Sequence, residues 1–429
     1  MRHGQNRANR PSARTVVLAA VTALLAAAPA PASASTHTAH TEHAAHAPPR
    51  TAPPDGCDTA RGALADRFGT LVARDGIPGT AAEVTGPHCG RWTVARGVAD
   101  LDTGRPMRAR DRLRIGSVTK TFTATVVVQL AAEGRIGLDA PVERYLPGLI
   151  RGNGHDGRRI TVRQLLQHTS GIPDHVNAAV ARPVEEWRRR HFEPRELVAT
   201  ALALPRPDTT WSYSTTNYVL AGLVVEQVTG HGIEAEVDRR IIRPLGLRDT
   251  YWPGDRTTIR GPHSRSYFPA PDPAPDTDTG PDPDTGPDRP DGTPPLDGTE
   301  WNMTFGGAGG ALVSTPADLN RFFHGLFGGR LLPARWLAEM KRTVPADPQR
   351  LWPGARYGLG LISSPLSCGG RWWGHGGTVP GGHRALGAVG PDGSGVALAL
   401  TKVPDTDRAE EEYLAAVDTA LCPSYKETK

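Results

Sequence analysis

Segments with the pattern of β-strands occur near both ends of the sequence, and segments with the pattern of helices fill the middle. Extended segments predict strands at 81–85, 91–99, 371–373, 385–389 and 396–401, and the second of them has alternating apolar residues. Helical spacing of apolar residues predicts helices at 162–167, 195–204, 218–229, 233–242, 318–326, 334–341 and 410–421. We therefore predict an α/β (α+β) fold, in which an antiparallel sheet is built from both chain ends and flanked by helices, with an inserted, mostly helical domain.

The beginning of the chain has the three parts of a secretory signal. Residues 1–14 hold four arginines, residues 16–28 are mostly apolar, and Ala32-Ser33-Ala34 has the small side chains of a cleavage site. We therefore predict a signal peptide at 1–34 and a secreted, extracellular protein in the vicinity of the cell wall. The apolar run is too short to span a bilayer comfortably, so no membrane association is expected after the signal is removed.

Composition divides the remaining chain. Residues 35–60 are rich in Ala, Pro, Thr and His and predict a disordered linker, followed by one folded domain at 61–422 and a tail at 423–429. Inside that domain, residues 269–298 hold ten prolines and eight aspartates and almost nothing apolar. This stretch predicts a disordered acidic insertion, because it cannot bury enough apolar surface to fold.

Charge and cysteine content exclude several classes of function. The formal charge is +4, but the predicted signal peptide holds four arginines and no acid, so the rest is nearly neutral and a nucleic-acid partner is not expected. The four cysteines fit an oxidising compartment and permit three pairings. We favour Cys57 with Cys89 and Cys368 with Cys422, since each pair lies near one end of the chain. No cysteine has another within four residues, so neither a metal nor a cofactor is predicted.

The segment Gly116-Ser117-Val118-Thr119-Lys120 indicates catalytic chemistry. It opens a run with helical composition, so we predict a helix that begins at Ser117 and places Ser117 and Lys120 on one face. The chain has 49 Lys plus Arg but only five lysines. A buried lysine can lose its proton whereas arginine cannot, so Lys120 is a candidate base for a Ser117 nucleophile. The alternative is an ordinary N-cap serine beside a solvated lysine.

Three motifs, in order, resemble those of a known family. Ser117-Val118-Thr119-Lys120, Tyr213-Ser214-Thr215 and His375-Gly376-Gly377-Thr378 resemble the motifs of the serine D-alanyl-D-alanine carboxypeptidases of the actinomycete type, a group similar to class C β-lactamases. The resemblance implies that Ser117 is the nucleophile that forms an acyl-enzyme. It implies that Lys120 and Tyr213 share proton transfer, the lysine cation lowering the tyrosine pKa toward an accessible phenolate. His375 would orient that tyrosine and attract a substrate carboxylate.

The same resemblance implies the groups that bind substrate. The backbone N–H groups of Ser117 and Thr378 would form an oxyanion hole, and Thr215, Gly377 and Thr378 would contact the substrate. The family usually has asparagine where this chain has Thr215, and commonly threonine where it has Gly376. An asparagine amide both donates and accepts, whereas a threonine hydroxyl offers one donor. Residues 361–366 hold no arginine, so a carboxylate clamp from that segment is not expected.

The resemblance predicts a monomeric serine hydrolase that needs no cofactor and acts on a small peptide, ester or β-lactam. The first hypothesis is D,D-carboxypeptidase activity on peptidoglycan stem peptides. The second is β-lactamase, esterase or D-amino-acid amidase activity on the same scaffold. The third is a catalytically weak penicillin-binding, wall-sensing module, suggested by Thr215 and Gly376. The glycine run at 306–310 lacks dinucleotide-binding spacing, so we expect it to pack closely beside the active site.

Overall fold

The computed structural model describes residues 55–268 and 295–422. The predicted signal peptide, most of the predicted linker, residues 269–294 and the predicted tail lie outside the described residues. Two predicted boundaries are wrong. Helix α1 (Asp55–Ala73) begins inside the predicted linker. Strand β8 (Leu296–Asp297), inside the predicted disordered insertion, pairs with β7 (Tyr267–Phe268).

A nine-stranded sheet contains strands from both chain ends in the order β10-β11-β12-β13-β14-β15-β1-β2-β3. The early strands are β1 (Gly79–Gly86), β2 (Gly90–Asp100) and β3 (Arg105–Pro106). The late strands are β10 (Val344–Pro345), β11 (Arg356–Tyr357), β12 (Ile362–Pro365), β13 (Arg371–Thr378), β14 (Arg384–Val389) and β15 (Gly395–Leu400). Strands β1 and β15 pair antiparallel, with Ala82 opposite Leu398. The sheet shared by both chain ends is therefore confirmed, whereas the short strands β10 to β12 were missed because two to four residues show no periodicity.

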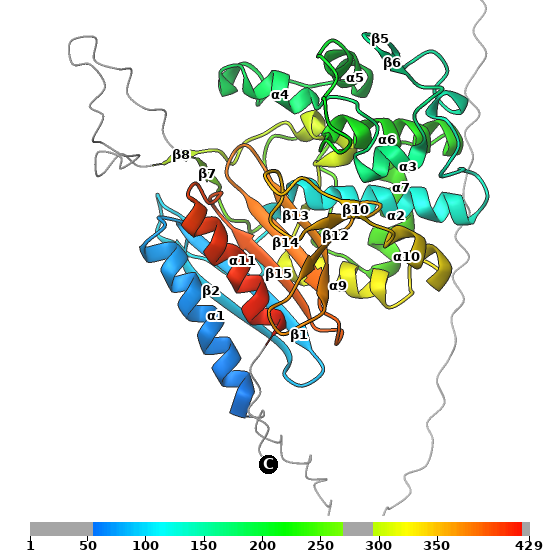
Figure 1. Ribbon diagram of the computed structural model, residues 1–429. Coiled ribbons are helices and arrows are strands. Elements are labelled where there is room, and N and C mark those ends of the chain that lie inside the picture. Colours follow the sequence, from blue (N-terminus) through cyan, green and yellow to red (C-terminus); the bar gives the residue numbers. More distant parts are fainter. Residues whose placement is uncertain (1–54, 269–294, 423–429) are drawn as a thin grey trace, which may run out of the picture. The chain divides into compact units, whose positions relative to one another are not determined.

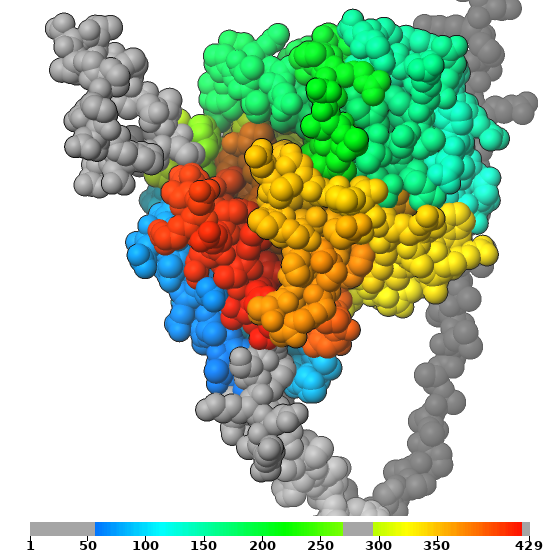
Figure 2. All heavy atoms as spheres, viewed as in Figure 1, coloured from blue at the N-terminus to red at the C-terminus, as the bar shows by residue number. Residues whose placement is uncertain are grey.

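Helices cover both faces of this sheet (Figure 1). Helices α1 and α11 (Asp407–Leu421) lie side by side on one face and bury a core that includes Phe68 and Tyr413. Figure 2 shows these two helices, in blue and red, adjoining on the same surface. Helix α9 (Pro316–Phe327) packs on β1, β14 and β15. The flanking of the sheet by helices is thus as predicted.

Two disulfides tie this arrangement together at the chain ends. Cys57–Cys89 joins α1 to the turn between β1 and β2, and Cys368–Cys422 joins the turn between β12 and β13 to the end of α11. Both are the predicted pairs. They close loops of 32 and 54 residues. Each disulfide should stabilise the folded state by roughly 4 kcal/mol, because it lowers the conformational entropy of the unfolded chain.

A mostly helical part lies between the two sets of strands. Its helices are α2 (Thr119–Ala132), α3 (Val162–Gln167), α4 (His175–Val180), α5 (Pro194–Leu202), α6 (Thr215–Thr229), α7 (Ile233–Val237), a π-helical turn (Asp238–Ile242) and α8 (Arg243–Leu245), followed later by α10 (Ala334–Met340). Small strand pairs accompany them: β4 (Leu113–Arg114) with β9 (Val313–Ser314), and β5 (Arg151–Gly152) with β6 (His155–Asp156). Within residues 55–268 and 295–422, none of the helices has the length and apolar character needed to cross a membrane.

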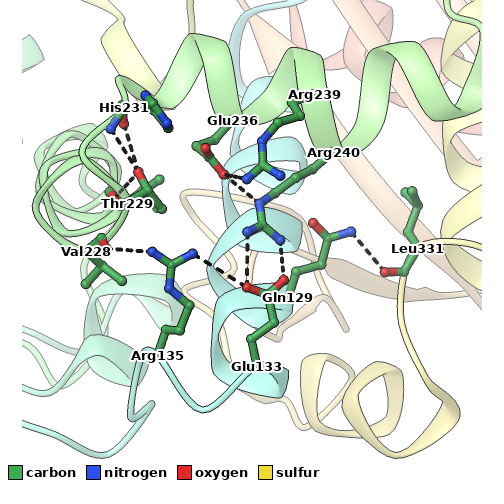
Figure 3. A network of polar contacts seen from close by, with 11 residues as sticks. Gln129, Glu133, Arg135, Val228, Thr229, His231, Glu236, Arg239, Arg240 and Leu331 are labelled. Carbon is green, nitrogen blue, oxygen red and sulfur yellow. Dashed lines mark hydrogen bonds and ion pairs between the residues drawn. The ribbon is translucent and has the colours of Figure 1, made fainter.

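Helix α2 is the central helix of this part, since 12 of its 14 residues are buried. Its far end is anchored by a network of ion pairs and hydrogen bonds (Figure 3). Arg240 contacts both carboxylate oxygens of Glu133, at 2.5 and 3.1 Å, and also Glu236 at 2.6 Å. Gln129 donates to the Leu331 carbonyl at 2.9 Å. These contacts hold α2 in place, and with it the residues at its other end.

Candidate active site

Ser117 lies in a 3-10 turn, Gly116–Val118, that leads directly into α2. The α-helix therefore begins at Thr119 and not at the serine, as the sequence pattern had predicted. Neither the turn nor α2 has a side-chain hydrogen bond at its N-cap, so the interpretation of Ser117 as an ordinary N-cap is wrong. Ser117 instead lines a cavity of about 550 Å³.

Lys120 is fully buried, so the alternative of a solvated lysine is also wrong. Its Nζ atom lies 3.1 Å from Ser117 Oγ, 2.9 Å from the Gly309 carbonyl oxygen and 3.4 Å from Thr215 Oγ1. Burial lowers the Lys120 pKa to about 7, against the opposing charge of Asp174. A large fraction of Lys120 is therefore the neutral amine near pH 7, the form that accepts a proton.

The glycine run at 306–310 lies beside this lysine, as predicted. A Cβ atom built on Gly309 would lie 2.7 Å from Thr215 Cγ2 and 3.3 Å from Lys120 Nζ. Glycine is needed there because a side chain would push Thr215 and Lys120 away from the Gly309 carbonyl.

Tyr213 is the second residue for which proton transfer was predicted. It lines the same cavity as Ser117, and Lys120 Nζ lies 4.9 Å from the centre of its ring. Burial raises the Tyr213 pKa above its ordinary value, and the nearby Ser117 side chain only partly offsets this. The expectation of an accessible phenolate is therefore corrected: Tyr213 stays protonated, and Lys120 is the group whose pKa is suited to a base.

His168 positions Tyr213, a role that the sequence did not reveal. Its imidazole packs on the Tyr213 ring with centroids 4.3 Å apart. Its carbonyl accepts from Ser212 N at 2.9 Å, and its Nδ1 accepts from Ser214 N at 3.1 Å. His168 ends α3 with φ of 62°, a left-handed conformation that is rare for a residue other than glycine. The three contacts hold the backbone on both sides of Tyr213.

The turn at Ser117 lies directly against strand β13. A Cβ atom on Gly377 would fall 2.8 Å from Ser117 N and 2.9 Å from Val118 N, and one on Gly116 would fall 2.9 Å from Thr378 N. The backbone amides of Ser117 and Thr378 are therefore close neighbours. This arrangement suits the predicted oxyanion hole, which needs two N–H groups aimed at one oxygen.

His375 has a different role from the predicted one. It is buried, and its Nδ1 is paired with the Gly376 carbonyl at 2.5 Å, so Nδ1 carries the proton. Its Nε2 is then an acceptor for the Tyr357 hydroxyl at 2.8 Å. Burial lowers the His375 pKa to about 3, so the ring is neutral near pH 7 and offers no charge to a substrate carboxylate. The hydrogen-bonding partner of His375 is Tyr357 and not Tyr213, which corrects the expectation that it orients the catalytic tyrosine.

The cavity brings most of the predicted residues together. Ser117, Tyr213, Thr215, His375, Gly377 and Thr378 all line it, and Lys120 lies beneath the serine. The sequence did not single out four charged residues that also line it, namely Asp174, Arg350, Arg384 and Glu410. None of these four residues belongs to one of the three motifs, which is why they were not identified from the sequence.

The two arginines that line the cavity differ in their ion pairing. Arg384 is paired with Glu410 and donates to Thr378 Oγ1, each at 2.5 Å. The Arg350 guanidinium lies 5.1 Å from the centre of the Tyr213 ring and makes no ion pair with any described residue. Among residues 55–268 and 295–422, no group of three or more His, Cys, Asp and Glu side chains is arranged to hold a metal ion.

Comparison with known proteins agrees with this geometry. Residues 64–420 match the sequence profile of the Beta-lactamase family. Esterase EstB of Burkholderia gladioli is 37% identical over 36% of this chain, and penicillin-binding protein 4 of Amycolatopsis lactamdurans is 31% identical over 43% of it. The matches span 42% and 47% of those two proteins, less than half of their length.

A solved structure is similar over a longer stretch. The D-stereospecific amidohydrolase from Streptomyces sp. is 39% identical, with a TM-score of 0.71, over 84% of this chain and 98% of that protein. A likeness of this extent includes both the sheet and the helical part between its strands.

Proposed function

We propose, since the chain belongs to the Beta-lactamase family of serine hydrolases, that it hydrolyses amide bonds of D-amino-acyl compounds through an acyl-enzyme on Ser117. The observation that carries this proposal is the 3.1 Å contact between Ser117 Oγ and Lys120 Nζ, in a lysine with a pKa of about 7. The activity named for the Streptomyces relative supports the D-amino-acyl class of substrate.

The reaction follows from the protonation states of the three groups. The neutral Lys120 amine takes the hydroxyl proton of Ser117 as Oγ attacks the substrate carbonyl carbon. The oxyanion that forms is stabilised by the N–H groups of Ser117 and Thr378. Tyr213 gives its proton to the leaving nitrogen and regains one from the Lys120 ammonium. Water then attacks the ester carbonyl, its proton returns to Ser117 through Lys120, and the acid is released.

The cavity wall suggests the kind of acyl side chain. Val176, Met303, Phe305, Leu351 and Trp352 line it and present apolar and aromatic surface. Such a wall stabilises an apolar side chain through burial, on the order of 25 cal/mol per Å². We therefore expect apolar D-amino-acyl groups to be preferred over charged ones.

D,D-carboxypeptidase activity is the second candidate, and Arg350 favours it. Its guanidinium makes no ion pair with a described residue and lies at the cavity beside Tyr213. It would meet the free carboxylate of a C-terminal D-alanine, in place of the clamp that is missing from residues 361–366.

The test compares hydrolysis of D-phenylalanine p-nitroanilide with that of its L-enantiomer, with Ser117→Ala as the control. We expect turnover of the D-form that depends on Ser117. Release of D-alanine from a D-Ala-D-Ala tripeptide, in preference to the anilide, would instead select the carboxypeptidase. Hydrolysis of a p-nitrophenyl ester or a cephalosporin alone would point to an esterase or β-lactamase, and covalent labelling by fluorescent penicillin without turnover to a sensing module.

A further inference from the structure

We propose that Asp174, acting through the hydroxyl of Thr215, fixes the direction of the hydrogen bonds around Lys120 so that the lysine lone pair faces Ser117. The inference rests on the proposed function only in requiring a nucleophilic Ser117. It assigns to two residues the role of a positioning pair.

The geometry places the three side chains in a row. Asp174 is 5% exposed, and its Oδ2 lies 3.4 Å from Thr215 Oγ1. Thr215 Oγ1 in turn lies 3.4 Å from Lys120 Nζ. The other oxygen, Asp174 Oδ1, accepts from Val176 N at 3.2 Å and so caps α4. Asp174 Oδ1 thus caps α4, whereas Oδ2 contacts the Thr215 hydroxyl that lies next to Lys120.

Hydrogen-bond direction follows from the chemistry of each group. An ionised carboxylate accepts and cannot donate, so the Thr215 hydroxyl donates to Asp174. The hydroxyl oxygen of Thr215 is then an acceptor for Lys120. The Gly309 carbonyl, 2.9 Å from Nζ, is a second acceptor. A neutral amine has two N–H groups, and both are used by these two acceptors. Its lone pair is left for the third neighbour, the hydroxyl of Ser117.

Asp174 also supplies the negative charge that acts on Lys120. The other titratable groups around the amine and the carboxylate are Tyr213, the Tyr218 ring at 5.5 Å from Nζ, the Arg350 cation and three histidines, His168, His175 and His375. All three histidines are neutral near pH 7, because burial lowers each pKa. The carboxylate therefore opposes the desolvation of the lysine, and its loss should lower the Lys120 pKa.

The pair would account for a threonine at position 215. An asparagine there offers its own amide oxygen to the lysine and needs no second residue to orient it. A threonine hydroxyl can point either way, and in the wrong direction it would donate to the lysine lone pair and block the base. Asp174 removes that ambiguity.

The test uses a double-mutant cycle at positions 174 and 215. Initial rates are measured with a p-nitrophenyl ester, whose hydrolysis reports acylation of Ser117 whatever the natural substrate. Thr215→Val should lower kcat about tenfold to 100-fold with little change in KM, whereas Thr215→Ser, which keeps the hydroxyl, should restore most of the rate. Asp174→Asn should lower kcat and move the acid limb of the pH profile to lower pH. In the Thr215→Asn background, Asp174→Asn should lower kcat by a much smaller factor than it does in the wild type.

Asparagine at 174 keeps an oxygen for the α4 cap, and circular dichroism of each variant checks that the fold is retained. Asp139→Asn is the matched control, because this carboxylate is 75% exposed and pairs with Arg163 at the surface; it should leave the profile unchanged. The proposal would be overturned if Asp174→Asn lowered kcat by the same factor in the wild type and in Thr215→Asn, or if the acid limb of the pH profile did not move. Ester hydrolysis that survives Ser117→Ala would overturn the proposed function instead.

Discussion

Gly377 lies so close to Ser117 that a Cβ atom on the glycine would fall 2.8 Å from the serine amide nitrogen. Two backbone segments, from the turn before α2 and from β13, therefore meet without room for a side chain. Gly376, its neighbour on the same strand, has room for a Cβ atom: the nearest atom would be the Ala385 carbonyl oxygen, in ordinary contact at 3.8 Å.

This difference predicts opposite outcomes for two matched substitutions. Gly377→Ala should force β13 away from Ser117, separate the Ser117 and Thr378 amides, and lower kcat by about 100-fold or more, as loss of an oxyanion donor does. Gly376→Ala should fold normally and keep kcat within about threefold. Steady-state kinetics and thermal unfolding of both variants provide the measurement. Equal activity of the two would contradict the close approach as the basis of the site.

The pKa of Lys120 predicts the pH dependence of acylation. The amine accepts a proton only when neutral, so kcat/KM should rise with pH and level off above the Lys120 pKa of about 7. The sign follows from burial, which disfavours the ammonium and moves the pKa down from its ordinary value. A profile from pH 5 to 9, measured with a substrate that does not ionise in this range, checks this expectation.

Lys120→Arg keeps the charge but removes the proton acceptor, so its acylation rate should fall by about 10² to 10⁴ at all pH values. Near-normal acylation by this variant would exclude Lys120 as the base.

Much of the fold was predictable from sequence because its signals are local. Alternation in 91–99, the apolar run 396–401 and helical spacing in 162–167 depend on neighbouring residues alone, and the structure confirms them as β2, β15 and α3. The short strands β10 to β12 are set by pairing, each with the next strand in the order toward β13, and carry no pattern of their own. The early start of α1 was missed because the composition of residues 35–60 predicted a disordered linker.

The residues of the candidate site that lie in the three sequence motifs could be predicted. Lys120 contacts Ser117 as the spacing implied, and Tyr213 lines the same cavity as the resemblance implied. The proton states were not predictable, because they depend on burial: the same burial that lowers the pKa of Lys120 raises that of Tyr213 and keeps His375 neutral. The partner of His375, Tyr357, lies on a strand that sequence patterns did not detect.

The packing of His168 on Tyr213 predicts a catalytic defect without loss of substrate binding. His168→Ala removes the acceptor of Ser214 N and the surface behind the Tyr213 ring, so the tyrosine should lose its fixed position. We expect kcat to fall about tenfold to 100-fold, since placement of a proton-transfer group contributes about that much. His231→Ala, at an exposed position at the end of α6, is the control. Unchanged kcat in His168→Ala would show that Tyr213 is positioned by other contacts.

The network at the far end of α2 predicts unequal effects for two neighbouring arginines (Figure 3). Arg239 and Arg240 both donate to Glu236 Oε2, at 2.7 and 2.6 Å, but their side chains are 57% and 10% exposed. Arg240→Met also leaves Glu133 without its bidentate partner, and should lower the free energy of unfolding by about 3 kcal/mol, because Glu236 is 1% exposed. Arg239→Met should cost at most about 1 kcal/mol, as exposed pairs do. Urea denaturation at equal ionic strength measures both, and equal losses would mean that the buried pair does not anchor α2.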